Sequence, residues 1–227
     1  MKEIEKMQAG LEYCYDDADI SMMKLHAIEN ANVFNSLAED DLDKQHEVLS
    51  EILGSVGEKV WIAKRFCFDN GKNIFIGNNF TGNFNLTILD IKEVYIGDNV
   101  MIGPNTTITT VGHPLSPKKR RDHLAQASEI RIGNDVWLGA NVTILPGVTI
   151  GNNVVVGAGA VVSKDIPDNS LALGVPARVV KKLENDIDWL KKWFKKWFKK
   201  RKNIKIKNRL RFDLNQNFFS RIKDLSL

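Results

Sequence analysis

A six-residue repeat of aliphatic side chains dominates the second half of the chain. One register holds Ile132, Leu138, Ile144, Ile150, Val156 and Val162, and another holds Val136, Val142, Val148, Val154 and Ala160. Fainter copies occur earlier, at Ile96, Ile102 and Ile108 and from Ile74 to Phe80. A period of six fits neither the 3.6-residue period of a helix nor the simple alternation of a strand. It is typical of a parallel β-helix, in which three hexads close one triangular coil and aliphatic side chains stack inward.

The repeat is interrupted between Ile108 and Ile130 by a polar stretch, "TTVGHPLSPKKRR", that surrounds His113. Glycine, asparagine and proline follow the apolar positions elsewhere, as in Gly133-Asn134 and Pro146-Gly147, and they suit the sharp corners of a coil. The aliphatic residues are expected to fill the prism. Because loops on a rigid scaffold often carry function, we expect the chemistry in the interruption.

The flanking segments have a helical pattern. Residues 1–57 contain a predicted helix that begins at Asp40 or Asp41 and stops at Gly54, and a second over residues 20–37. The apolar positions of the second are Met22, Leu25, Ile28 and Phe34. We therefore predict three segments: a helical segment over 1–57 that covers an end or flank of the prism, a β-helix over 58–183, and a tail over 184–227.

The tail has a different composition from the rest. Residues 186–202 are predicted to form an amphipathic helix, with Trp189, Trp193 and Trp197 at i, i+4 spacing and lysine pairs between them. From Lys181 onward there are 16 lysines and arginines against 5 acidic residues, which leaves about −7 for the rest. The pattern fits a helix lying on an anionic membrane surface, or one packing its aromatic side chains on the protein. Nucleic-acid binding is a third, less favoured interpretation, because no recognised motif is present.

Composition excludes several classes of protein. A hydrophobic content of 43% supports a globular core, and no apolar run approaches the roughly 20 residues that cross a bilayer. Residues 1–10 lack the apolar centre of a signal peptide, so we expect a cytoplasmic protein. Cys14 and Cys67 are far apart and have no CxxC spacing, which indicates unpaired thiols without a disulfide framework or zinc site.

Several motifs occur in an order and spacing that identify a family. The stretches "IGDNVMIGPNTTITTVGHPL", "IGNDVWLGANVTILPGVTIGNNVVVGAGAVVSKDIP" and "GVPARVV" resemble the galactoside and maltose O-acetyltransferases. The resemblance runs from about Lys6 to Leu183. It implies trimers of left-handed parallel β-helices that transfer acetyl from acetyl-CoA to a sugar hydroxyl, without a metal.

The same resemblance implies that His113, which precedes Pro114, is the catalytic base. A sugar hydroxyl attacks a thioester poorly, and a neutral imidazole that accepts its proton raises the rate, typically about 10²- to 10⁴-fold. We expect a backbone N–H group to stabilise the oxyanion that forms on the acetyl carbonyl. The other histidines, His26, His46 and His123, are interpreted as surface or packing residues.

Residues for the acceptor and the donor also follow from the resemblance. Asn83 in "TGNFN" matches an asparagine that orients the acceptor hydroxyl, and Asp69, Asp90 and Asp17 are candidate acceptor contacts. On the donor side, Trp137 is expected along the pantetheine, with Ala140 and Ala158 as small residues against which it lies. The phosphate contacts are expected from Ser163, Lys164, Arg178 and Lys181. Departures from the family pattern occur at Ile91, Asn70 and Glu129, and they leave the acceptor open.

The sequence leaves three alternatives open. The same scaffold can acetylate a non-sugar acceptor such as an antibiotic, or an amino sugar, with His113 unchanged in role. A β-helix zinc enzyme of the carbonic anhydrase type needs three converging histidines, and only His113 and His123 lie in or beside the coil region. A non-catalytic binding or scaffold protein would not need His113, Trp137 and the phosphate cluster together.

Overall fold

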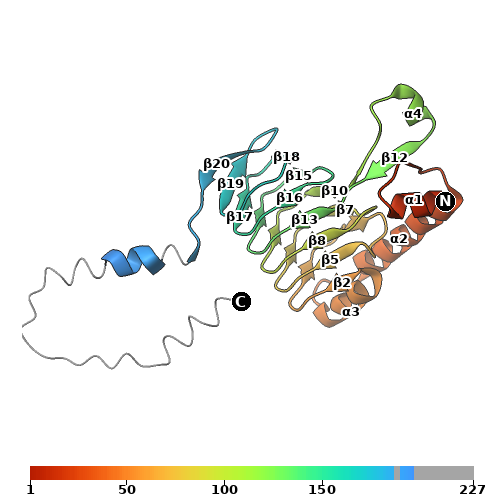
Figure 1. Cartoon of the computed structure of the whole chain (residues 1–227). Coiled ribbons are helices and arrows are strands. Elements are labelled where there is room, and N and C mark those ends of the chain that lie inside the picture. Colours follow the sequence, from red (N-terminus) through yellow and green to blue (C-terminus); the bar gives the residue numbers. More distant parts are fainter. Residues whose placement is uncertain (187–189, 197–227) are drawn as a thin grey trace, which may run out of the picture. The chain divides into compact units, whose positions relative to one another are not determined.

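The computed structural model describes residues 1–186 and 190–196, and Figure 1 shows their elements. The chain divides into two units, Met1–Asn185 and Asp186–Leu227. The first unit is built from short strands stacked in successive coils, with three helices near its N-terminal end. This arrangement confirms the predicted parallel β-helix.

Each coil contributes one strand to each of three faces. Face 1 consists of β2 (Ser55–Val56), β5 (Ile74–Ile76), β8 (Val94–Ile96), β13 (Ile130–Ile132) and β16 (Thr149–Ile150). Face 2 consists of β3 (Trp61–Ile62), β6 (Thr81–Gly82), β9 (Met101–Ile102), β14 (Trp137–Leu138), β17 (Val154–Val156), β19 (Ser170–Leu173) and β20 (Arg178–Lys182). Face 3 consists of β4 (Cys67–Phe68), β7 (Thr87–Leu89), β10 (Thr107–Thr109), β15 (Thr143–Ile144) and β18 (Val161–Val162). Neighbouring strands are parallel on every face, except that β20 turns back antiparallel to β19.

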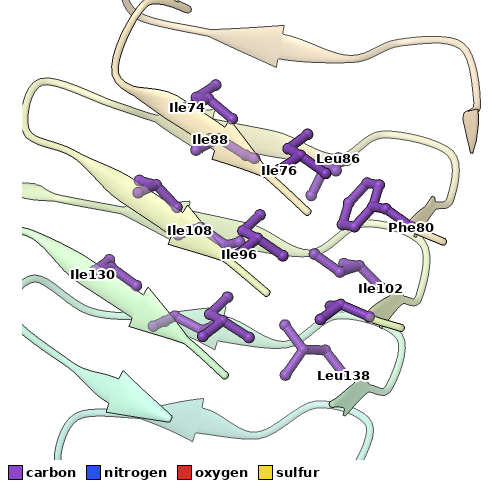
Figure 2. Close-up of a cluster of buried hydrophobic side chains, with 14 of the residues drawn as sticks. Ile74, Ile76, Phe80, Leu86, Ile88, Ile96, Ile102, Ile108, Ile130 and Leu138 are labelled. Carbon is purple, nitrogen blue, oxygen red and sulfur yellow. The ribbon is translucent and has the colours of Figure 1, made fainter. Parts of the chain in front are cut away.

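The repeated aliphatic side chains form the core of the prism. Ile108 on β10 is aligned with Ile88 on β7 and with Ile144 on β15, and all three are completely buried. Figure 2 shows the same stacking for side chains from all three faces, including Ile96, Ile102 and Leu138. The six-residue period therefore marks inward-pointing positions, because a two-residue strand and the four residues of a corner, as from β14 to β15, together make one hexad.

Asparagine, more than glycine, makes the corners of the coils. Seven asparagines have positive φ values between 51° and 59°, a conformation that asparagine tolerates better than most residues. Their side chains also connect neighbouring coils: Asn79 Nδ2 donates to Asn99 Oδ1 at 2.9 Å, and Asn99 Nδ2 donates to Asp135 Oδ1 at 3.0 Å. The corners are thus fixed both by backbone conformation and by side-chain ladders.

Three helices precede the coils: α1 (Glu3–Gln8), α2 (Ala18–Ser36) and α3 (Leu42–Ile52). Asp41 caps α3 by accepting a hydrogen bond from the N–H of Lys44, and the apolar face of α3 packs into the core cluster of the prism. This confirms the predicted helix and its covering role.

The apolar face predicted for α2 was wrong in part. Met22, Leu25 and Ile28 are 65%, 50% and 55% exposed, and Ile20, Ala27, Ala31 and Phe34 are buried instead. The small alanines let α2 approach the coils closely, which turns the larger side chains away from the core.

The interruption between Thr110 and Glu129 forms a loop with its own small sheet. It contains β11 (Val111–Gly112), α4 (Pro117–Arg121) and β12 (Leu124–Ala127), and Figure 1 shows it extending away from the stacked coils. Strand β12 pairs antiparallel with β11 and with β1 (Tyr13–Cys14), so the N-terminal segment is attached to the loop.

In the second unit, residues 190–196 are helical, and the rings of Trp193 and Phe194 meet edge to face with centroids 5.2 Å apart. The rest of the predicted amphipathic helix, including Trp189 and Trp197, lies outside the described residues. None of the helices in the described parts of the chain has the length and apolar character needed to cross a membrane.

Candidate active site

His113 lies in the loop that connects β10 on face 3 with β13 on face 1. The corner between these two faces, from which the loop leaves the prism, is here called the 3–1 corner. The His113 side chain is exposed, and its Nδ1 lies 3.2 Å from the carbonyl oxygen of Leu124. A carbonyl oxygen can only accept, so the neutral ring must carry its proton on Nδ1. This leaves Nε2 with a lone pair, which is the state that a general base requires.

Two segments distant in sequence hold His113 in place. Strand pairing aligns Cys14 with Leu124 and Gly112 with Gln126, so the Leu124 carbonyl belongs to a three-stranded sheet. The Tyr15 ring meets the His113 ring edge to face, with centroids 5.3 Å apart and an interplanar angle of 77°. The exposed histidine is therefore supported through both its Nδ1 atom and its ring.

Two of the predicted acceptor residues lie near this corner. Asp69 follows β4 at the 3–1 corner and its Oδ1 lies 3.8 Å from Lys24 Nζ. Burial raises the pKa of Asp69, and the charge of Lys24 opposes this shift. The pKa of Tyr13 is raised to about 12 by burial and by the charge of Asp69. Asp17 is the N-cap of α2, where its Oδ1 accepts from the N–H groups of Asp19 and Ile20, leaving Oδ2 for another contact.

The structure contradicts the expectation that Asp90 contacts an acceptor. Asp90 is completely buried, and its Oδ1 accepts from the N–H groups of Asp69 and Asn70 at 3.0 and 2.9 Å. Its Oδ2 accepts from the N–H of Asn73 at 3.3 Å. Burial raises its pKa to about 7, against the effect of these backbone donors. Asp90 therefore anchors the loop after β4, because no part of its carboxylate reaches solvent.

Asn83, Ala140 and Ala158 lie at a different corner, which follows face 2 and is here called the 2–3 corner. Ala140 and Ala158 occupy equivalent positions of successive coils and are here called the donor column, and Asn83 lies one position earlier in its own coil. Backbone hydrogen bonds between successive coils give the order of the coils. The N–H of Asn83 donates to the carbonyl oxygen of Ile102, that of Gly103 to Leu138, and that of Gly139 to Val156. Asn83 Oδ1 accepts from the N–H of Phe84 at 2.9 Å, so its Nδ2 is the group available to a ligand. Small side chains at this corner leave room for an extended molecule along the prism.

Trp137 projects from face 2 beside that column and is 51% exposed. A row of paired residues on neighbouring strands runs from Trp137 through Val155 and Leu171 to Lys181 on β20. Lys181 and Arg178 are both exposed. The indole and the two cations therefore lie along one face, as a donor with an apolar arm and phosphates would need.

Ser163 and Lys164 are not part of this group within one chain. They follow β18 on face 3 and precede Ile166, which bridges to Ile150 on face 1, so they lie on the 3–1 corner. The predicted phosphate cluster is thus divided between two edges of the prism. His113 and Asn83 likewise lie on different corners, so a single chain does not bring His113 beside the donor column.

Sequence reasoning missed two contributors to the His113 site. Tyr15 contacts the ring of His113, and the Leu124 carbonyl fixes its tautomer. No local signal marks them, because the pairing of β1 with β12 joins residues about a hundred positions apart. His123, interpreted from sequence as a surface or packing residue, stacks on Tyr15. Among the described residues, no group of three or more histidine, cysteine or acidic side chains could hold a metal ion.

Comparison with known proteins gives consistent matches. A family model described as "Bacterial transferase hexapeptide (six repeats)" matches residues 129–164, and "Maltose acetyltransferase hexapeptide capping motif" matches residues 6–57. Galactoside O-acetyltransferase of Escherichia coli (strain K12) is 46% identical over 155 residues, covering 68% of this chain and 76% of the relative.

Two solved structures are also similar over most of the chain. A maltose O-acetyltransferase from Clostridium difficile 630 has a TM-score of 0.79 at 40% identity, covering 82% of this chain and 99% of that one. A galactoside acetyltransferase in complex with coenzyme A has a TM-score of 0.78 at 41% identity, covering 83% of this chain and 94% of that one. These matches confirm the resemblance inferred from the sequence motifs.

Proposed function

The chain belongs to the galactoside and maltose O-acetyltransferase family of hexapeptide-repeat proteins, and we propose that His113 is the base with which it acetylates a sugar or glycan. It is an acetyl-CoA-dependent O-acetyltransferase, in keeping with the relative whose structure holds coenzyme A. The observation that carries the assignment of His113 is the Nδ1 contact with the Leu124 carbonyl, which leaves Nε2 free to accept a proton.

In the proposed reaction, Nε2 of His113 accepts the proton of the acceptor hydroxyl as its oxygen attacks the thioester carbon. The C–S bond then breaks, and the departing thiolate takes the proton from the imidazolium to give CoA and the acetyl ester. Leu124 keeps the ring in one tautomer and stabilises the imidazolium through the same Nδ1–H bond. Asn83 Nδ2 orients the acceptor hydroxyl, and Asp69 and Asp17 bind other acceptor groups.

We assign the backbone N–H of Ala140 to the oxyanion that forms on the acetyl carbonyl. Ala140 lies in the column of small residues, and the hydrogen bonds found among the described residues do not use its N–H. A Cβ atom placed on Gly103 would lie 2.6 Å from the Ala140 nitrogen and 2.7 Å from the Gly139 carbonyl carbon, so a side chain there would displace the backbone that carries this donor. Preorganised donors of this kind contribute about 3 to 4 kcal/mol to acyl transfer.

The donor fits the residues along face 2 and the 2–3 corner. Trp137 offers an exposed indole to the pantetheine arm, and Ala140 and Ala158 let the arm lie against the coils. Arg178 and Lys181 lie farther along face 2, where they can pair with the phosphates. Ser163 and Lys164 would join them from a neighbouring subunit.

Completion of the site requires a second chain, and we propose a homotrimer with three interfacial sites. His113 belongs to the 3–1 corner, whereas Asn83 and the donor column belong to the 2–3 corner. Packing one chain's 3–1 corner against its neighbour's 2–3 corner would bring the two halves together. Sedimentation equilibrium on the active protein should give three times the chain mass of 25.6 kDa, and an active monomer would contradict the proposal.

The experiment that tests the function measures thiol release from acetyl-CoA with a panel of galactosides, glucosides, maltose, amino sugars and chloramphenicol-like alcohols. Turnover with a sugar hydroxyl that falls at least about 10²-fold in His113→Ala is expected. His46→Ala, which changes a histidine on α3, serves as the matched control and should keep full turnover. Turnover confined to non-sugar acceptors would replace the sugar in the proposal. CoA binding without any turnover would support a binding protein instead.

We further propose that the tail contacts an anionic membrane surface. The support is the spacing of its tryptophans and lysine pairs and the exposure of Lys195 and Lys196 in the described helical turn. Liposome flotation of the full chain should exceed that of a chain ending at Leu183. Equal recovery of both in the unbound fraction would end this proposal and leave the enzymatic one intact.

A further inference from the structure

Tyr15 is placed between the proposed catalytic base and a second histidine. Its ring meets His113 edge to face at 5.3 Å and 77°, and it stacks on His123 at 5.3 Å and 19°. The backbone N–H of Tyr15 donates to the carbonyl oxygen of His123 at 2.9 Å, just beyond the paired residues of β1 and β12. The ring is therefore fixed relative to the loop by both backbone and side-chain contacts.

His123 is itself held in an unusual conformation. It follows α4 with φ of +57°, and its N–H donates to the Arg120 carbonyl oxygen at 3.1 Å. Its Nδ1 lies 3.1 Å from Asp16 Oδ2, which sets the orientation of the ring. A non-glycine residue with positive φ persists only where its surroundings stabilise it, and here Tyr15 and Asp16 supply those contacts.

These contacts form a continuous array from Asp16 through His123 and Tyr15 to His113. Both ends of the array come from the same two segments, residues 13–16 and 113–124. The His113 side chain is exposed, and its hydrogen bond to the described residues is made through Nδ1, so that bond alone leaves the ring free to pivot about it. A second contact on the ring removes that freedom and fixes the direction of Nε2.

We propose that Tyr15 is a positioning residue: its aromatic ring, clamped by His123, sets the direction of His113 Nε2 toward the acceptor hydroxyl. This inference rests on the proposed role of His113. A base misplaced by about 1 Å can reduce turnover about 10²-fold. Because Tyr15 acts through the ring of His113 and does not touch the donor column, its loss should lower kcat and leave the KM for acetyl-CoA unchanged.

The test compares Tyr15→Phe, which keeps the ring, with Tyr15→Leu, which replaces it by an aliphatic group. We expect Tyr15→Leu to lower kcat by roughly 10- to 100-fold with the KM for acetyl-CoA within twofold, and Tyr15→Phe to keep kcat within about threefold. Tyr95→Leu is the matched control, because Tyr95 also stacks on an aromatic ring, that of Phe75, but on face 1. It should keep the wild-type kcat.

His123→Asn and Asp16→Asn test the same array from exposed positions, where the side chains are 48% and 70% exposed, and asparagine tolerates the positive φ of position 123. Both should lower kcat less than Tyr15→Leu does, by roughly 2- to 10-fold. A kcat within twofold of wild type in Tyr15→Leu, or equal losses in Tyr15→Phe and Tyr15→Leu, would overturn the proposal. If His113→Ala kept wild-type turnover in the same assay, the proposed role of His113 would itself be wrong. This result separates a failure of the proposed function from a failure of the positioning role of Tyr15.

Discussion

The buried carboxylate of Asp90 predicts an unusual dependence of stability on pH. Asp90 is completely buried after β7, and burial raises its pKa from 3.8 to about 7. A carboxyl group whose pKa is higher in the folded than in the unfolded state stabilises the fold while it is protonated. The contribution is fully present below about pH 4 and is lost as the pH rises through 7.

The magnitude follows from the difference between the two pKa values. Each unit of difference corresponds to about 1.4 kcal/mol, so the full effect is roughly 4 kcal/mol. Between pH 5 and pH 8 the unfolded carboxyl group is ionised throughout, and the folded one ionises near 7. The free energy of unfolding should therefore fall by roughly 2 to 3 kcal/mol across this interval on account of Asp90 alone.

The assay is urea unfolding of the wild type and of Asp90→Asn at several pH values and one protein concentration. Asp90→Asn keeps an acceptor for the N–H groups of Asp69 and Asn70 but cannot ionise, so its pH dependence should be flatter by the amount given above. Asp98→Asn removes a carboxylate that also accepts a backbone N–H, from Asn78, at a less buried corner, and it controls for loss of a charge. Parallel pH curves for the wild type and Asp90→Asn would refute the reasoning.

Three further predictions follow from the core, the oxyanion site and the donor site. Ile108→Ala, at a completely buried position, should lower the free energy of unfolding by about 2 to 5 kcal/mol in urea, and a loss below 1 kcal/mol would contradict the stacked core. Gly103→Ala should lower kcat about 10²-fold by displacing the backbone that carries the Ala140 N–H, and unchanged kcat in a folded variant would remove Ala140 from the site. Lys181→Ala should raise the KM for acetyl-CoA by roughly 3- to 10-fold but not that for acetyl-pantetheine, which lacks the nucleotide phosphates. An equal rise for both donors would show that Lys181 does not bind phosphate.

The sequence predicted the fold because the aliphatic position of each hexad is also the position that is buried in the prism. Ile132, Leu138 and Ile144 repeat at the spacing that places every one of them inside the prism, so local pattern and burial agree. The cap at Asp41 was also readable, since capping depends on residues three positions apart. The wrong apolar face of α2 shows the limit of such patterns: the choice between Ala27 and Leu25 was made by how closely the coils approach the helix.

Asp90 shows a second limit, since a motif position does not report depth. A carboxylate beside the predicted site was a reasonable acceptor contact, yet it is enclosed by the loop that it anchors. Local sequence gives no measure of how many backbone N–H groups converge on a side chain, because those donors come from the previous coil.

By itself, then, the sequence determined the β-helix and the family and pointed to His113 as the candidate base, since these depend on period and motif. Only the tertiary structure decided which side chains meet. It brought Tyr15 and the Leu124 carbonyl to His113 through the pairing of β1 with β12, across more than a hundred residues. It also placed His113 and Asn83 on different corners of the prism. Contacts of this kind depend on the register of distant strands and on the number of residues in each coil, which no local pattern records.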